Sequence, residues 1–153
     1  MYDQMRKKGA VSTLRRERAE DIYRAYLNLP GDGGPGSWRM ADVCRRVVNM
    51  PSRRFWVSPR RAAEVVGRLL RGEGAGVMRG ERLRMFEEIA SRTAAMMGGC
   101  GGGGMPLLYA VERVVLEPAP CFYLSAESAR KILIEQCRRA RQRAAGRKMR
   151  REP

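Results

Sequence analysis

Arginine is the residue type with which this 153-residue sequence could do most chemistry. Basic residues number 31 and acidic residues 16, which gives a net charge of +15, and 27 of the basic residues are arginine. The planar guanidinium carries a fork of N–H donors that fits phosphate oxygens and the guanine edge. The positive charge therefore predicts a polyanionic partner, most simply nucleic acid. The choice of arginine over lysine adds little, because a GC-rich genome produces the same bias.

The basic residues gather in two clusters. Residues 138–151 contain eight cations and no acid, a run typical of phosphate contacts without sequence information. The alternative is a solvated tail that only keeps the protein soluble. The other cluster surrounds Trp56 and includes the first turn after Ser58, where a helix N-terminus favours anions. The predicted nucleic-acid-binding residues are Arg45, Arg46, Arg53, Arg54, Trp56, Arg60, Arg61, Arg138, Arg139, Arg141, Arg143, Arg147, Lys148, Arg150 and Arg151.

The absence of histidine removes most catalytic chemistry. No Ser-His-Asp or Cys-His pair, imidazole base or histidine-containing zinc site can be built from this sequence. The closest carboxylate pairs, Glu20-Asp21 and Glu87-Glu88, are sequence neighbours on arginine-rich helices. We expect them to be surface ion-pair partners and not an acid/base couple. The sequence predicts no enzyme, no catalytic residue and no cofactor.

The cysteines form no metal-binding pattern. Their positions are Cys44, Cys100, Cys121 and Cys137, with no C-x-x-C pair, so we expect reduced thiols, partly buried in helices, and no metal site. The basic residues 6–8 are followed by Gly-Ala-Val-Ser-Thr instead of the apolar core of a signal peptide. No apolar run approaches the ~20 residues of a membrane span. We expect a soluble cytoplasmic protein of the bacterial cytosol or nucleoid with no membrane partner.

Helical spacing of apolar residues predicts the elements that position these clusters. The 3.6-residue period recurs in six segments with little sign of strand, which predicts an all-α fold. Helix starts are predicted at Ser12 or Thr13, Ser37, Ser58-Pro59, Gly80, Pro106 and Ser125. The last helix is expected to run into the basic tail.

A shift of 67 residues aligns the middle of the chain with its last third. Residues 43–71 and 110–138 share eight identities over 29 pairs, including a box of the form Pro-x-x-x-Phe-aromatic-aliphatic-Ser that ends at Ser58 and at Ser125. We predict a tandem repeat of two trihelical, helix-turn-helix-like units related by a pseudo-two-fold axis, an arrangement natural for homodimers. The expected organisation is a basic arm (1–11), a first unit (12–72), a linker (73–78), a second unit (79–140) with a glycine-rich loop (98–104), and a basic tail (141–153).

Each box carries a short extended segment, Phe55-Trp56-Val57 in the first and Phe122-Tyr123-Leu124 in the second. Two interpretations stay open. The segments pair as a two-stranded ribbon at the pseudo-dyad, as in ribbon-helix-helix proteins, or they are extended linkers whose phenylalanines fill the core. The connection of about eight residues is longer than the roughly 3–4 of a helix-turn-helix motif, so the recognition-helix assignment is a weak signal.

The two boxes resemble those of small basic proteins of bacterial prophages and mobile elements, over residues 43–71 and 110–138. The boxes differ in charge, because Arg53-Arg54 in the first correspond to Pro120-Cys121 in the second. The resemblance implies a mobile-element origin and assigns no activity.

Together these features predict a non-enzymatic nucleic-acid-binding protein that acts in regulation or maintenance of a phage or mobile element, with duplex DNA favoured over RNA. One alternative is a phage structural or assembly protein, located in the particle, that contacts the genome or an acidic protein. Another is an RNA-binding protein whose arginines and exposed aromatics stack on single strands. A second copy of the chain, in a homo-oligomer, is a further candidate partner, and a large symmetric assembly would favour the structural or assembly role over the DNA-binding one.

Overall fold

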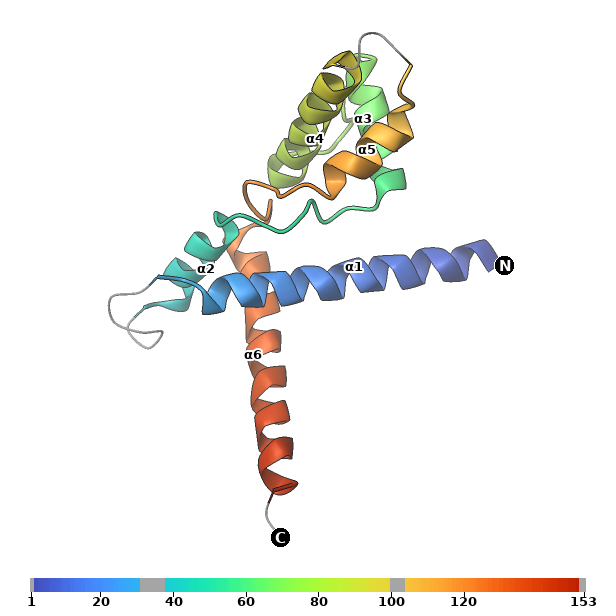
Figure 1. The fold of residues 1–153 in the computed structure, drawn as a ribbon. Coiled ribbons are helices and arrows are strands. Elements are labelled where there is room, and N and C mark those ends of the chain that lie inside the picture. Colours follow the sequence, from blue (N-terminus) through green and yellow to red (C-terminus); the bar gives the residue numbers. More distant parts are fainter. Residues whose placement is uncertain (1, 31–37, 100–103, 152–153) are drawn as a thin grey trace.

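The described part of the chain is helical throughout (Figure 1). The computed structural model describes residues 2–30, 38–99 and 104–151. Its elements are α1 (Tyr2–Leu27), α2 (Met40–Val48), α3 (Pro59–Leu70), α4 (Gly80–Gly99), α5 (Leu107–Val115) and α6 (Ala126–Met149). Six helices and no strand in these ranges confirm the predicted all-α class.

Two predicted helix starts carry the hydrogen bonds of a cap. The Ser58 hydroxyl accepts a hydrogen bond from the Arg61 N–H (3.2 Å), and the Ser125 hydroxyl accepts one from the Ser128 N–H (3.1 Å). These bonds satisfy donors that the first helical turn leaves without a partner. Pro59, at the first position of α3, has no N–H to satisfy.

Two other predicted starts are wrong. Helix α1 begins at Tyr2 instead of Ser12 or Thr13, because residues 2–11 contain no proline and one interior glycine costs a helix only about 1 kcal/mol. The range expected to be a basic arm is therefore helical from residue 2. The N-cap of α2 is Arg39, which makes no side-chain cap bond. Ser37, the predicted cap, lies outside the described residues.

The helices pack as two three-helix clusters. Helices α1, α2 and α6 contact one another, and so do α3, α4 and α5, whereas no described helix of one cluster packs on a helix of the other. The core of the α1/α2/α6 cluster includes Ile22 and Leu133. The core of the α3/α4/α5 cluster includes Phe86 and Val114. In Figure 1 the α3/α4/α5 cluster lies above α1, and α6 runs downward away from it.

This packing differs from the predicted grouping into units 12–72 and 79–140. Each of those ranges supplies two helices to one cluster and its third helix to the other. Helices α2 and α3 therefore do not contact each other, unlike the two helices of a helix-turn-helix motif. The physical reason lies in the connectors, residues 49–58 and 116–125, where Pro51 and Pro118 favour an extended chain that carries the next helix away.

The two connectors cross at one antiparallel bridge. Ser52 and Ala119 exchange both backbone hydrogen bonds, at 3.0 Å each. Beside the bridge, the Phe55 N–H donates to the last carbonyl of α5 and the Phe122 N–H donates to the last carbonyl of α2, again at 3.0 Å. The described connectors thus pair at a single bridge, and the pairing does not extend into a two-stranded ribbon.

The aromatic residues of each connector point alternately into the two clusters. Phe55, 1% exposed, lies in the α3/α4/α5 core, and Trp56 packs on the α1/α2/α6 core. Phe122, 4% exposed, lies in the α1/α2/α6 core, and the Tyr123 ring packs on the other, stacked on Phe55 with 6.0 Å between centroids. Both phenylalanines fill the core, as the second interpretation of the boxes expects.

Candidate nucleic-acid interface

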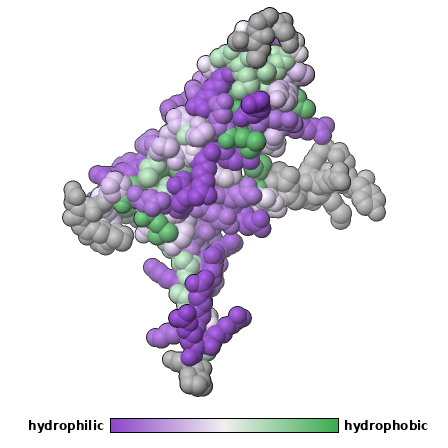
Figure 2. Space-filling view, viewed as in Figure 1, coloured by the Kyte–Doolittle hydropathy of each residue, from purple (hydrophilic) through white to green (hydrophobic). Residues whose placement is uncertain are grey.

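The C-terminal half of α6 projects from the clusters (Figure 1), and its surface is strongly hydrophilic (Figure 2). Every residue from 141 to 151 is exposed. Within the described residues, no ion pair involves its six cations, which are Arg141, Arg143, Arg147, Lys148, Arg150 and Arg151. Successive residues turn by about 100° around a helix axis, so these six cations fall within one half of the circumference of α6, and Gln142, Ala145 and Gly146 lie on the other half. The cations therefore form one broad basic face that can contact phosphates along its length.

The two remaining basic residues of this run are engaged within α6. The guanidiniums of Arg138 and Arg139 donate to the carboxylate of Glu135 at 2.7 and 2.9 Å. Hydrogen bonds from Arg138 and then Arg139 lower the pKa of Glu135 to about 2. Both arginines are therefore paired with an ionised carboxylate at neutral pH, so they attract a phosphate less strongly than the cations after Ala140 do.

Arg45 and Arg46 lie on the exposed face of α2. Arg45 forms an ion pair with Asp42, and the guanidinium of Arg46 lies 4.0 Å from the ring centroid of Trp38. Exposed ion pairs contribute less than about 1 kcal/mol, so a phosphate can compete for either guanidinium. Both predicted residues are accessible in the structure.

Asp21 holds the start of the first connector. The carboxylate is 2% exposed and accepts hydrogen bonds from the Ser52 hydroxyl (3.1 Å), the Arg53 N–H (2.9 Å) and the Arg24 guanidinium (2.8 Å). The Arg53 side chain adds an ion pair at 3.5 Å. The prediction that Asp21 forms ion pairs is confirmed, but the prediction that it lies at the surface is wrong, because a long-range contact with the connector buries it.

Arg54 and Trp56 are also used inside the fold. The Arg54 guanidinium donates to the carbonyls of Phe55 (3.1 Å) and Val57 (3.2 Å), and burial lowers the pKa of Arg54. The indole N–H of Trp56 donates to the Ser52 hydroxyl at 2.7 Å. Both side chains are half-buried. They stabilise the connector, so fewer of their hydrogen-bond donors and less of their surface can contact a ligand than the sequence prediction assumes.

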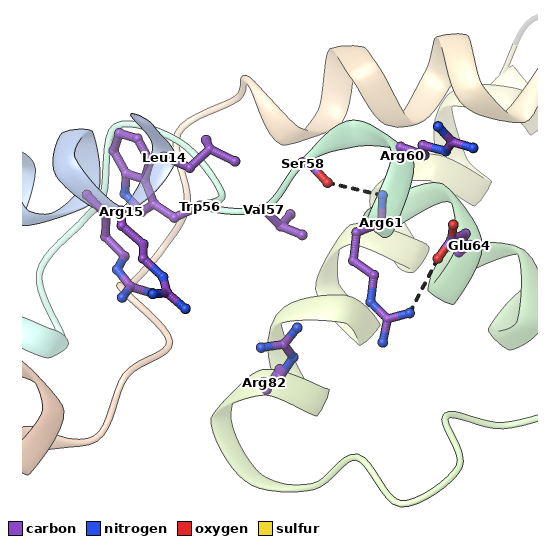
Figure 3. Close-up of a pocket in the computed structure, with 10 residues that line it drawn as sticks. Leu14, Arg15, Trp56, Val57, Ser58, Arg60, Arg61, Glu64 and Arg82 are labelled. Carbon is purple, nitrogen blue, oxygen red and sulfur yellow. Dashed lines mark hydrogen bonds and ion pairs between the residues drawn. The ribbon is translucent and has the colours of Figure 1, made fainter. Parts of the chain in front are cut away.

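Arg60 and Arg61 lie beside a groove between α1, α3 and α4, with a volume of about 730 Å³. Its lining consists of Leu14, Arg15 and Arg18 from α1, Trp56, Val57 and Ser58 from the connector, Arg60, Arg61 and Glu64 from α3, and Arg82 from α4. In Figure 3, Arg15 and Trp56 lie on one side of the groove and Arg61 and Arg82 on the other, while Arg60 extends away from Arg61.

The groove has an excess of positive charge. Arg61 pairs with Glu64 at 3.4 Å, and Glu64 is the single acid among the lining residues. The Nε of Arg18 is buried and has no hydrogen-bond partner. Burial lowers the pKa of Arg18, and the positive charges of Arg15 and Arg82 lower it further. The arrangement is suited to an anion.

The sequence prediction missed the three arginines that α1 and α4 bring to this groove. Arg15 and Arg18 belong to the run Arg15-Arg16-Glu17-Arg18, which lies beside acidic residues, and Arg82 lies far along the sequence; only the fold places the three beside α3. One signal was available: Arg15 and Arg82 are 67 residues apart, the same separation as the two boxes. Of the predicted residues, only Trp56, Arg60 and Arg61 line the groove.

The described cysteines are free thiols. Cys44 is buried, which raises the pKa of its thiol, while Cys121 and Cys137 are half-buried. Cys100 lies outside the described residues. In the described ranges, no helix combines the length and apolar character needed to cross a membrane.

Comparison with known proteins adds no assignment. No family model, no curated protein and no solved structure matches this chain. The resemblance to prophage and mobile-element proteins therefore stays a prediction.

Proposed function

We propose that this chain is a non-enzymatic nucleic-acid-binding protein whose partner is duplex DNA. The observation that carries the proposal is the exposed end of α6, where residues 141–151 hold six cations without an ion pair in the described chain. Such a helix stays extended in solvent although its charges repel one another, and phosphates relieve that repulsion. The accessible Arg45, Arg46 and Arg60 add further basic surface.

The state of the tryptophans favours duplex over single-stranded partners. Single-strand binding uses aromatic faces on which bases stack. Here the Trp56 ring packs on the α1/α2/α6 core with its indole N–H bonded, and the Trp38 ring is covered by the Arg46 guanidinium. The Trp38 ring is thus covered on one face, and the part of the Trp56 ring that is left accessible lines a groove instead of an open surface, which favours phosphate contact along a duplex over stacking of single-stranded bases.

The architecture we infer is a duplicated unit whose third helices have been exchanged about a pseudo-two-fold axis. Three observations support it: α2 and α5 have nine residues each and start 67 residues apart, the capping serines are 67 residues apart, and the bridge joins Ser52 to Ala119, also 67 residues apart. The resemblance of the boxes favours a role in regulation or maintenance of a phage or mobile element.

Fluorescence anisotropy with a labelled duplex tests the proposal. Affinity should fall steeply as salt rises from about 50 to 200 mM, because each phosphate contact releases counterion. Truncation after Ala140 removes six cations and should weaken binding to every duplex similarly, with the slope of log K against log salt shallower by up to about 5. No affinity at ~50 mM salt, or affinity indifferent to salt, would overturn the proposal.

A matched pair of variants separates the helix from net charge. Arg141→Ala with Arg143→Ala removes two cations from the end of α6, and Arg71→Ala with Arg84→Ala removes two that are paired with glutamates. The first pair should weaken binding more. Competition with single strands and structured RNA identifies the partner: preferential displacement by RNA would replace duplex DNA as the assignment.

A further inference from the structure

The groove between α1, α3 and α4 is the cavity whose charge the fold leaves unbalanced. Five arginines line it with one acid, and the described lining residues form one ion pair, Arg61 with Glu64. Like charges gathered beside protein repel more strongly than in bulk water. The free chain is therefore destabilised at this place, and an anion in the groove removes the destabilisation.

Arg18 shows where in the groove an anion would be bound. Its Nε is buried without a hydrogen-bond acceptor, a state that is destabilising and rare in native proteins. The guanidinium lies in the field of Arg15 from its own helix and of Arg82 from α4. Two further cations, one from the same helix and one from α4, thus act on an arginine whose Nε lacks an acceptor. An anionic oxygen would accept from this donor and would also reduce the repulsion among the three charges.

The groove also has space and apolar surface next to these charges. Its volume of about 730 Å³ falls in the usual range of ~300–1,000 Å³ for ligand pockets, which is more than a bare oxyanion fills. Leu14, Val57 and the Trp56 ring lie among the arginines (Figure 3). This combination fits a phosphate with organic substituents, such as the sugars on either side of a backbone phosphate.

We propose that this groove binds a phosphate group of the nucleic-acid backbone, with Arg15, Arg18 and Arg82 around its oxygens and Arg61 turning to it from Glu64. That the phosphate belongs to a backbone rests on the function proposed above, whereas the phosphate site stands on the groove itself. Because α1 belongs to one cluster and α3 and α4 to the other, a bound phosphate also ties the two clusters together.

Inorganic phosphate probes the site without nucleic acid. Thermal unfolding of the full chain is followed by circular dichroism in phosphate and in chloride of equal ionic strength, which separates binding from screening. Phosphate at about ten times its Kd should raise the Tm by roughly 4 °C more than chloride does. Arg18→Met keeps an apolar stem and removes the guanidinium, so it should abolish this difference.

Two further variants sharpen the test. Arg16→Met is the control, because Arg16 lies on the same helix, loses the same charge and does not line the groove; its phosphate response should persist. Glu64→Gln removes the competitor for Arg61 and should tighten phosphate binding severalfold. Equal curves in phosphate and chloride for the unaltered chain overturn the site, and so does a full response in Arg18→Met. If Arg18→Met does not fold, Arg82→Gln on the exposed start of α4 makes the same test.

Duplex DNA then distinguishes a backbone phosphate from a free anion. Arg18→Met should weaken duplex binding about tenfold and lower the salt slope by about 1, and Arg16→Met should do less. If duplex binds with a steep salt dependence while phosphate gives no response, the site is refuted and the proposed function stands. If phosphate stabilises the chain but no duplex binds, the proposed function falls and the groove is a site for a free phosphate compound.

Discussion

Replacing Phe55 by alanine should destabilise both clusters, although the ring lies in only one of them. Phe55 is 1% exposed, stacks on Tyr123, and has the Arg92 guanidinium 5.1 Å from its centroid. Removing a ring buried to this degree costs about 4 kcal/mol. That is a large part of the roughly 5–15 kcal/mol by which domains are stable, and with a urea m-value of about 2 kcal/mol/M it lowers the midpoint by about 2 M.

The coupling between clusters follows from the order of the helices along the chain, because α3, α4 and α5 of one cluster lie between α2 and α6 of the other. The α1/α2/α6 cluster has a core of nine buried residues in the described chain, too few to be stable alone. If the α3/α4/α5 cluster unfolds, α6 stays tethered to α2 only through a long loop, whose closure costs entropy. Loss of Phe55 should therefore also release α6 from α1 and α2.

Tryptophan fluorescence can observe the second cluster separately. The sequence has two tryptophans, and in a Trp56→Phe background the remaining Trp38 packs on the α1/α2/α6 core. In Phe55→Ala, the Trp38 transition and the far-UV circular dichroism transition should fall together by about 2 M urea. Phe122→Ala, in the other core, should give the same result. A Trp38 transition that keeps its midpoint while half of the ellipticity is lost would refute the coupling.

Three further predictions concern one carboxylate, one tyrosine and the C-terminal tail. Asp21→Asn should cost about 2 kcal/mol in urea denaturation, because the Ser52 hydroxyl and the Arg53 N–H lose a charged, buried acceptor; the exposed Glu20→Gln should stay within about 0.5 kcal/mol, and equal losses would show that Asp21 is not the anchor. Burial raises the pKa of Tyr123 to about 12, so one tyrosine should ionise last in an absorbance titration at alkaline pH, and Tyr123→Phe should lack that step. Because the folded pKa lies above the unfolded value near 10, this tyrosine contributes stability that is complete below pH ~10 and lost between about 10 and 12. Truncation after Ala140 should change the free energy of unfolding by less than about 0.5 kcal/mol, since residues 141–151 are exposed; a larger loss would place part of the core in the tail.

Local signals predicted the elements well, and tertiary contacts account for what was missed. Ser58 and Ser125 predict the starts of α3 and α6 because the hydrogen bond of an N-cap joins residues only three apart in the sequence. Apolar stripes likewise predicted α2 and α5. The start of α1 had no such signal, since helix formers continue upstream of Ser12 and a serine inside a helix looks the same as a serine that caps one.

The partner of each helix could not be predicted from the sequence. Shared boxes at 67-residue spacing are equally compatible with two units that fold separately and with two units that exchange their third helices. The two alternatives differ in whether the connectors turn back or cross, and in the structure they cross, with two backbone hydrogen bonds between Ser52 and Ala119. The same reason explains the two residues that sequence reasoning did not place. Asp21 was expected at the surface, but connector 49–58 buries it. Arg18 was missed because its importance depends on Arg82 of the distant helix α4.

The division of the helices into two clusters also explains why a charged groove can exist in this fold. Within one compact three-helix cluster, apolar faces meet and exclude arginine. Here α1 lies beside α3 and α4 without packing on them, so cations can collect between the clusters, and the connector, held by Asp21, keeps the clusters at this distance. The repulsion among Arg15, Arg18 and Arg82 opposes that closeness in the free chain and reverses to attraction when a phosphate enters. The same junction that couples the two cores in unfolding would thus couple phosphate binding to their relative position.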